Sequence, residues 1–429
     1  MAANRCGRGA WDSPMITMMA AIILVAGAVF AGHEQIANRK ILVFREGTTR
    51  QVHKQVVERH ELKMLHYLEP LNAMAIALPE AGAEMALAAL QGELNVARVD
   101  DDTRISADHV VSITPVAAPA EEFFPWGVER IGIPVVLDLI VSGSSSEPAV
   151  AILDTGVDPQ HPELLPHLAG GYNARAKENP SDYRDYNGHG THLAGIIAAA
   201  WNASGIIGTA TNPKLVAVKV LDNTGHGYVS DLIRGLQWVL ERGIKVANMS
   251  LSFAEGSPLL EEVTKQLYAA GVIMVASAGN RCKGGPDYGG AAEEGGDSGC
   301  DSTSASVNYP AAYPTVLAVV ATDIQNQLAA YSASGPEADL AAPGGDEATG
   351  QILSTTVGGG YGVASGTSQA AAHVTGGVAV ALQLAPWLSA EEVVSLLKGS
   401  AKDLGYSAPH QGAGLLAVDN VVKKLLGLP

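Results

Sequence analysis

Short apolar runs alternate with helical stretches over the C-terminal two thirds of the chain. Four of these runs are rich in β-branched residues and hold almost no polar position, which is the pattern of strands buried on both faces of a sheet. The runs cover 150–153, 215–220, 246–250 and 272–276, and helical patterns cover 230–241 and 368–384. This alternation predicts an α/β fold over residues 123–429, with a mainly parallel sheet flanked by helices.

A second pattern occupies residues 32–107. Strand-like runs and helical stretches alternate there in the order strand, helix, strand, helix, strand, which predicts a separate small α+β unit. The five elements are expected at 41–44, 48–61, 71–78, 81–94 and 96–99. Residues 108–122 hold Pro115, Pro119 and several alanines, and this composition predicts an exposed linker between the two units.

The first 31 residues have the pattern of a signal peptide. Arg5 and Arg8 precede an apolar run that starts near Met15, and the run ends in the small-residue sequence Val29-Phe30-Ala31. A basic start, an apolar middle and a small-x-Ala end predict export, with cleavage after Ala31. The product would be secreted, to an extracellular or periplasmic location. The run is also long enough for an uncleaved membrane anchor, and that alternative stays open.

The charge balance narrows the choice of partners. The chain of 429 residues has 27 basic and 44 acidic residues, a formal net charge of −17. A strongly acidic protein repels the phosphates of nucleic acids and of anionic lipids, so neither is an expected partner. A membrane would be a partner only through an uncleaved N-terminal segment.

Two of the three cysteines flank a Gly-rich, acidic stretch. Cys282 and Cys300 lie 18 positions apart, whereas Cys6 lies in the segment expected to be removed. In an exported protein such a pair predicts a local disulfide, and two free thiols are the alternative. No C-x-x-C motif or neighbouring histidine supplies further ligands, so zinc is not expected.

Three short motifs carry candidate chemistry. Asp154 follows an apolar strand and is followed by Thr155-Gly156, which places a carboxylate where the sheet opens. His189 lies between two glycines at the start of a helix, and Ser368 follows Ser365-Gly366-Thr367 where another helix begins. The backbone N–H groups at such a helix start have no intrahelical partner and favour negative charge.

Together these residue types are suited to acyl transfer. A serine hydroxyl is a poor nucleophile at neutral pH and needs a base to take its proton, a role for which His189 has the right pKa range. A carboxylate then holds the tautomer of the base and stabilises the imidazolium, and Asp154 fits that role. The tetrahedral intermediate also needs donors for its oxyanion, and the Ser368 backbone N–H and the side chain of Asn280 are the candidates.

Each motif alone has another interpretation. One D-T-G sequence does not make an aspartic protease, because that class needs two copies. The glycines at 358–360 suggest a phosphate loop, but no lysine follows Gly366, so a P-loop is excluded. The specific signal is the combination of the three motifs and their order along the chain: Asp154, His189, Ser368.

With that order the sequence resembles the subtilisin-like serine proteases over nearly all of residues 125–425. The segments around 125–128, 189–195, 309–314 and 342–344 look like landmarks of this family. Two further segments resemble the strands that pair with substrate, and the resemblance implies substrate-binding roles for Gly225, His226, Gly227, Ser250, Leu251, Ser252, Ala278 and Gly279. Peptide substrate would add to these strands in an extended form.

Residues 32–107 resemble the inhibitory propeptide of the same family, a small ferredoxin-like α+β domain. The resemblance implies that this unit assists folding, blocks the cleft as an intramolecular inhibitor and is removed by self-cleavage between residues 107 and 122. The peptidase domain would then cover 123–429.

The sequence departs from the family pattern close to the nucleophile. Gln369 stands where the family usually has Met, and Ala372 stands where it usually has Pro. Alanine is the better helix former, so the helix is expected to survive. Ser252 replaces a usual glycine on one substrate strand. These departures motivate an alternative function, a catalytically weak or inactive relative that acts as a binding protein.

The resemblance also implies a structural calcium ion and a specificity loop. Residues 200–208 match the length of the family's calcium loop, and Glu163 and Asn202 are the expected side-chain ligands because calcium prefers such oxygens; a metal-free turn is the alternative. The acidic stretch 281–306 would lie beside the primary specificity pocket. Its carboxylates would favour basic substrate residues, or else form only a solvated surface loop.

The sequence as a whole therefore predicts a secreted, monomeric serine endopeptidase that is made as a self-processing zymogen and needs no cofactor for catalysis. Its substrates would be polypeptides. Asp154, His189 and Ser368 would form the triad, with Asn280 in the oxyanion hole.

Overall fold

A seven-stranded sheet forms the centre of the structure, a computed structural model that describes residues 38–107, 113–280 and 306–429. The strand order is β15-β14-β13-β11-β7-β9-β8, and all neighbours run parallel. The strands are β7 (Ala149–Asp154), β8 (Leu168–Asn173), β9 (Lys214–Lys219), β11 (Val246–Met249), β13 (Ile273–Ser277), β14 (Leu317–Thr322) and β15 (Ala338–Pro343). The predicted α/β fold is thus confirmed, and the four predicted strands are β7, β9, β11 and β13.

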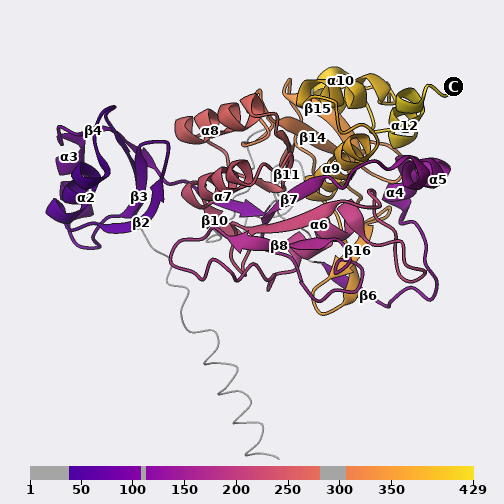
Figure 1. The fold of residues 1–429 in the computed structure, drawn as a ribbon, viewed down its shortest axis with the longest axis horizontal. Helices are drawn as coiled ribbons and strands as arrows, with labels where there is room; N and C mark the ends of the chain where they lie inside the picture. Colours follow the sequence, from indigo (N-terminus) through magenta and orange to yellow (C-terminus); the bar gives the residue numbers. More distant parts are fainter. Residues whose placement is uncertain (1–37, 108–112, 281–305) are drawn as a thin grey trace, which may run out of the picture.

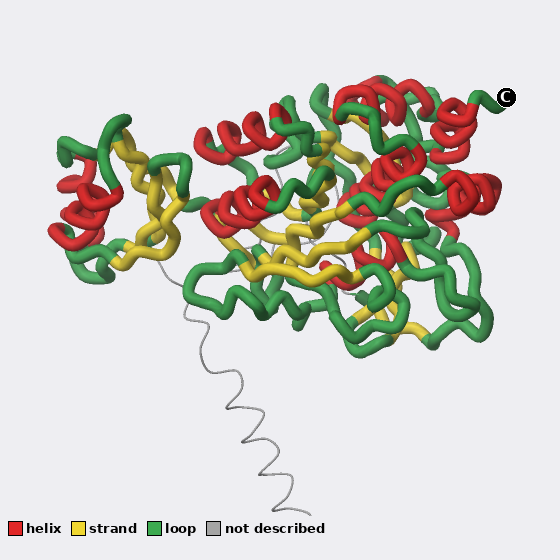
Figure 2. The backbone as a smooth tube through the Cα atoms, in the orientation of Figure 1, coloured by secondary structure: helices red, strands yellow, loops and turns green. Residues whose placement is uncertain are grey.

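Helices cover both faces of this sheet, as Figure 2 shows in red against the yellow strands. Val150 and Ile152 of β7 pack into one core, whereas Ala151 and Leu153 pack into the other, which explains why the strand has no polar position before Asp154. The first core is covered by α5 (Ile133–Gly143), α6 (His189–Ala198), α9 (Thr367–Leu384), α10 (Ala390–Ser400) and α12 (Val418–Leu426), and the second by α7 (Val229–Glu241) and α8 (Pro258–Ala269).

The strand order reverses between β7 and β11. From β7 the chain continues to β8 and β9 on one side, and it then crosses to β11 on the other side of β7. Connections that leave in opposite directions open a crevice at the carboxyl ends of the two strands, where open α/β sheets place their ligands. Asp154, the last residue of β7, lies at this point.

The N-terminal unit is a four-stranded antiparallel sheet with two helices on one face. The strand order is β2-β3-β1-β4. Its elements are β1 (Arg39–Phe44), α2 (Arg50–Arg59), β2 (Lys63–Leu68), β3 (Ala73–Ala77), α3 (Ala83–Gln91) and β4 (Val96–Asp101). The sequence analysis missed β2, because this edge strand has no regular alternation of buried and exposed positions. The face without helices packs toward α7 (Figure 1).

Two short strands follow the N-terminal unit. β5 (Arg104–Ala107) is the middle strand of a three-stranded sheet, between β10 (His226–Tyr228) and β12 (Leu251–Ser252). β6 (Thr114–Val116) adds to the hairpin of β16 (Ile352–Thr356) and β17 (Gly360–Ala364). β6 lies within the predicted exposed linker, and its three residues are exposed as expected.

The remaining helices are short: α4 (Trp126–Arg130) and α11 (Ala408–Gln411). Within the described ranges no helix has the length and apolar character needed to cross a membrane. The predicted signal peptide, Cys282, Cys300 and the acidic stretch from 281 to 305 lie outside the described residues.

Candidate active site

A buried ion pair joins the predicted base to the predicted acid. The Nδ1–H of His189 donates to Oδ1 of Asp154 at 2.8 Å, and the two side chains are 2% and 0% exposed. The backbone N–H of Thr155 donates to the same oxygen at 2.7 Å and fixes the carboxylate. A carboxylate on Nδ1 leaves Nε2 as the nitrogen that can accept a proton.

Glycines bring this pair together. α6 begins at His189, after Gly188 with φ +111°. A Cβ on Gly190 would lie 2.1 Å from the carbonyl oxygen of Gly156, so only glycine lets the start of α6 approach the end of β7. The Gly190 N–H donates to Oγ1 of Thr155 at 3.0 Å, which closes the contact.

The predicted nucleophile lies at the start of the central helix. Ser368 is the second residue of α9, is fully buried and follows the helix cap Gly366. Its hydroxyl lies 3.5 Å from the backbone oxygen of Ser250, and Ser250 Oγ donates back to the Ser368 carbonyl at 3.1 Å. α9 packs against α6, so His189 and Ser368 both lie at the N-terminal ends of two contacting helices. The predicted helix through Ala372 is confirmed, since α9 is continuous.

The side chain of Asn280 faces the same helix start. Its Oδ1 accepts hydrogen bonds from the Thr367 N–H at 3.0 Å and from the Thr367 hydroxyl at 2.8 Å. These bonds orient the amide so that Nδ2 lies 3.1 Å from the position that a Cβ on Gly366 would occupy, and the Ser368 N lies 3.7 Å from that position. One side-chain nitrogen, Asn280 Nδ2, and one backbone nitrogen, that of Ser368, therefore converge on a space that glycine leaves open.

The two predicted substrate strands lie on either side of the chain that follows the N-terminal unit. Ile105 pairs with Gly227, and Ser106 pairs with both His226 and Ser252. The Ala107 N–H donates to the Gly225 carbonyl at 2.8 Å, and Leu251 pairs with Ala107. The side chain of Ile105 is 1% exposed and packs in the core. An extended segment thus adds a strand between β10 and β12.

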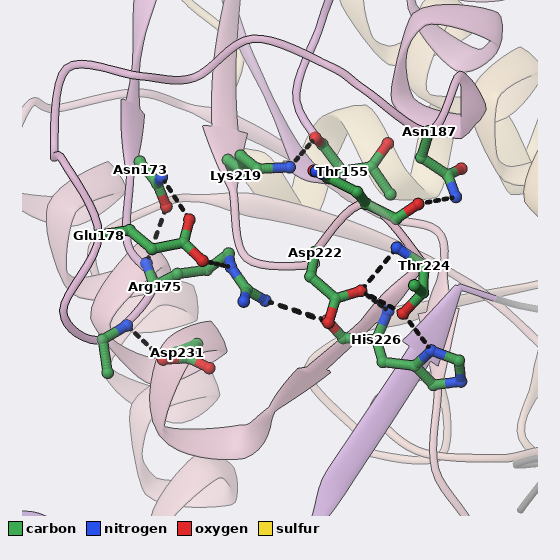
Figure 3. Close-up of polar contacts among 12 residues, drawn as sticks. Thr155, Asn173, Arg175, Glu178, Asn187, Lys219, Asp222, Thr224, His226 and Asp231 are labelled. Carbon is green, nitrogen blue, oxygen red and sulfur yellow. Dashed lines mark hydrogen bonds and ion pairs between the residues drawn. The ribbon is translucent and has the colours of Figure 1, made fainter. Parts of the chain in front are cut away.

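A network of polar side chains that the sequence analysis missed builds the turn before β10 (Figure 3). Oδ1 of Asp222 accepts from the Thr224 N–H at 2.8 Å, from the Thr224 hydroxyl at 2.6 Å and from the His226 N–H at 3.0 Å. Arg175 donates to the His226 carbonyl at 3.1 Å. Burial alone would raise the pKa of Asp222, but these hydrogen bonds and the Arg175 charge lower it. The D-x-T spacing of an Asx turn was the available signal.

Ala278 and Gly279 lie in the connection between β13 and Asn280. The Ala278 carbonyl accepts from the Asn308 N–H at 2.9 Å, and the Gly279 carbonyl accepts from the Ala333 N–H at 2.9 Å. Gly279 has φ +106°, and a Cβ there would lie 2.5 Å from Asn308 Nδ2. Their backbone therefore shapes the wall that carries Asn280.

The two predicted calcium ligands contact each other. Asn202 Nδ2 donates to Glu163 at 3.2 Å, and the Tyr361 hydroxyl donates to the other Glu163 oxygen at 2.6 Å. Glu122, which the sequence analysis missed, accepts from the backbone N–H groups of Asn202 and Ala203 at 2.6 and 2.8 Å. The two carboxylates and the amide come from three separate segments of the chain, and their oxygens fit the preference of calcium. No cluster of three His, Cys, Asp or Glu occurs in the described part of the chain, so amide and carbonyl oxygens would complete the set.

Comparison with known proteins agrees with this geometry. The model of the Subtilase family, Peptidase_S8, matches residues 145–415. Subtilisin E of Bacillus subtilis (strain 168) is 35% identical over 366 residues, 85% of this chain and 84% of that protein. The subtilisin of Bacillus pumilus is 38% identical over 295 residues, 68% of this chain and 97% of that protein. An alkaline protease of Shouchella clausii is 33% identical over 359 residues, 84% of this chain and 81% of that protein.

These likenesses define the class of protein, a serine-type endopeptidase with a subtilisin-like α/β fold. The chain belongs to the subtilase family.

Proposed function

We propose that the chain is the zymogen of a secreted endopeptidase that hydrolyses peptide bonds in polypeptides through Asp154, His189 and Ser368. The observation that carries the proposal is the buried Asp154–His189 hydrogen bond at the switch point of the sheet, beside a helix that begins at the residue before Ser368. The alternative of an inactive binding protein gains no support from the family comparisons.

The chemistry follows from these positions. The Ser368 oxygen adds to the carbonyl carbon of the substrate, and its proton passes to Nε2 of His189. Asp154, through its bond to Nδ1, stabilises the imidazolium that forms. The carbonyl oxygen becomes an oxyanion, which Asn280 Nδ2 and the Ser368 N–H would bind. Collapse breaks the C–N bond, the amine leaves with the proton, and water repeats the sequence on the acyl-enzyme.

The N-terminal unit would act as the propeptide. Its following strand, β5, occupies the place between β10 and β12 that an extended substrate would take, which supports inhibition in cis. Beyond the next described residue, Ile113, the chain continues along β17 as β6. We place maturation between residues 107 and 122, removal of the signal peptide after Ala31, and the product outside the cell as a monomer. A membrane-held form would require an uncleaved signal segment.

Calcium would be held by Glu122, Glu163 and Asn202. When bound it would supply positive charge to these carboxylates and would tie the loop at 200–208 to the N-terminal end of the peptidase unit. It would take no part in the chemistry.

The test of the catalytic assignment is a fluorophosphonate probe together with N-terminal sequencing. We expect the full-length protein to be shortened at a site between 107 and 122 and to be labelled on Ser368. Ser368→Ala should be neither shortened nor labelled, whereas Ser365→Ala, three residues earlier between β17 and α9, should be both. Labelling of Ser368→Ala would refute the assignment.

A further inference from the structure

Besides Asn280, a second side-chain amide lies near the nucleophile, and this one has no hydrogen-bond partner among the described residues. Gln369 directly follows Ser368 in α9 and is fully buried. Neither its Oε1 nor its Nε2 bonds any group in the described ranges. A buried amide without partners lowers the stability of a fold, because its bonds to water are lost and not replaced.

A second glutamine in the same helix shows the ordinary arrangement. Gln383 is also fully buried, and its Nε2 donates to Ser144 at 3.1 Å and to Thr211 at 2.9 Å, while its Oε1 has no partner among the described residues. The helix therefore accepts a buried glutamine amide where protein groups pair it. At Gln369 the missing partner points to a ligand.

The Gln369 amide is aimed at the space beside the nucleophile. The position that a Cβ on Gly366 would occupy lies 2.8 Å from Gln369 Oε1, 3.1 Å from Asn280 Nδ2 and 3.7 Å from the Ser368 N. Because no bond fixes the orientation of the Gln369 amide, a half-turn about its last side-chain torsion exchanges Oε1 and Nε2. This rotation places a third N–H donor beside Asn280 Nδ2 and the Ser368 N–H.

We propose that the Gln369 amide donates a hydrogen bond to the substrate oxyanion, as a third donor beside Asn280 Nδ2 and the Ser368 N–H. The inference rests on the proposed function, since the oxyanion exists only if Ser368 attacks. Gln369 exchanges no proton: as the Ser368 Oγ–C bond forms, the C=O π pair moves to the oxygen, and Gln369 shares in binding that charge. The Gln369 amide gains its hydrogen-bond partner only when the oxyanion forms. The bond therefore lowers the barrier of the chemical step and does not tighten substrate binding.

The experiment compares the self-processed enzyme with Gln369→Met, which keeps the length of the side chain and removes its donors. We expect kcat/KM on a peptide substrate to fall about 10- to 100-fold, with KM nearly unchanged, because one donor of an oxyanion hole carries an effect of about this size or larger. Affinity for a peptide boronate, which forms a tetrahedral anion on the serine, should fall by the same factor. Gln369→Glu, which offers only acceptors at neutral pH, should lose more.

Active-site titration with the fluorophosphonate probe normalises each rate to the folded fraction. Gln383→Met is the matched control, and it should lower the melting temperature but leave kcat, KM and boronate affinity unchanged. Unchanged kcat/KM in Gln369→Met, or an effect on KM alone, overturns the inference. The proposed function fails separately, if Ser368 of the unaltered enzyme is not labelled.

Discussion

The N-terminal unit and the peptidase unit bury their sheets in different ways. The peptidase unit covers both faces of its seven-stranded sheet with its own helices. The N-terminal unit covers one face with α2 and α3 and leaves the other face to α7 of the peptidase unit. Departure of the N-terminal unit would therefore expose its own apolar face but leave the larger core of the peptidase unit closed. The asymmetry suits a segment that is used once and removed.

The boundary between the units also holds a buried cluster of charged side chains that come from both units. Arg39 in β1 donates to Asp102 at 2.7 Å and to the hydroxyl of Ser230, in the first turn of α7, at 2.7 Å. It lies 3.5 Å from Asp231 and over the ring of Tyr228. Burial alone would lower the pKa of Arg39, but the charges of Asp231 and Asp102 outweigh burial and raise it. Asp102 belongs to the N-terminal unit with Arg39, whereas Asp231 and Ser230 belong to the peptidase unit. The cation therefore has its full set of partners only while both units are in place.

Replacing this cation should give the largest effect on the boundary. Arg39→Met leaves Asp102 and Asp231 buried without their shared cation, and loss of one partner of a buried charge pair costs about 3–5 kcal/mol. In the uncleavable Ser368→Ala chain, we expect the unit to open at least about 100-fold more often. The Val229 N–H, which donates to the Thr103 carbonyl at 2.9 Å, reports this opening by hydrogen–deuterium exchange.

The adjacent residue offers a matched control. Lys40 also lies in β1, but its partner Asp101 has a 76% exposed side chain, and exposed pairs contribute little. Lys40→Met should change exchange at Val229 by less than about fivefold. Equal effects of the two substitutions would contradict the view that the buried charges hold the units together.

How much of this fold could be predicted depended on pattern strength. Strands buried on both faces, such as β7 and β13, were found because an unbroken apolar run allows few alternatives. β14 was missed although it is buried along its whole length. The edge strands β2, β8 and β15 were also missed: β2 mixes exposed and buried positions, and β8 contains Gly170 and Gly171. Edge strands bury only part of their surface, so their sequences are weakly constrained.

The residues of the candidate site also fall into those that the sequence predicted and those that it missed. Asp154, His189 and Ser368 were named from motifs, because glycines and helix starts mark places where a side chain must meet another element. Glu122 and Asp222 were missed, since their roles come from contacts with Asn202 and His226 that lie across a turn or far along the chain. An acidic residue in a connecting segment has no local pattern that distinguishes such a role from solvation.

The stability of the interior of the peptidase unit should depend on pH, whereas the boundary between the units depends on the charge of Arg39. Burial lowers the pKa of His373 to about 4 despite its hydrogen bond to the Gln369 carbonyl, and that of His192 to about 3. An unfolded histidine titrates near 6.5, so below that pH the unfolded chain binds protons that the folded chain refuses. Stability should fall as the pH drops from about 6.5 to 4, by about 3 kcal/mol for His373 alone.

The measurement is urea unfolding of the Ser368→Ala chain at pH 7 and pH 4. His373→Asn cannot titrate and keeps an N–H near the position of Nδ1, so it should lose about 3 kcal/mol less between the two pH values. His410→Asn, at an exposed position in α11, should leave the pH dependence unchanged. A full acid loss in His373→Asn would show that other groups carry it.

The smallest expected effect concerns the loop at 200–208, which contacts Glu122 and Glu163. With calcium at about 30 times its dissociation constant, binding to Glu122, Glu163 and Asn202 would stabilise the folded state by about 2 kcal/mol. A chelator should then lower the melting temperature of the Ser368→Ala chain by about 2–3 °C. Glu163→Gln, which removes the buried carboxylate, should melt at one temperature with and without chelator. Glu261→Gln, which removes only an exposed ion pair with Lys265 in α8, should keep the full shift. Chelator insensitivity of the parent chain would mean that the Tyr361 and Asn202 hydrogen bonds to Glu163 hold this loop without a metal.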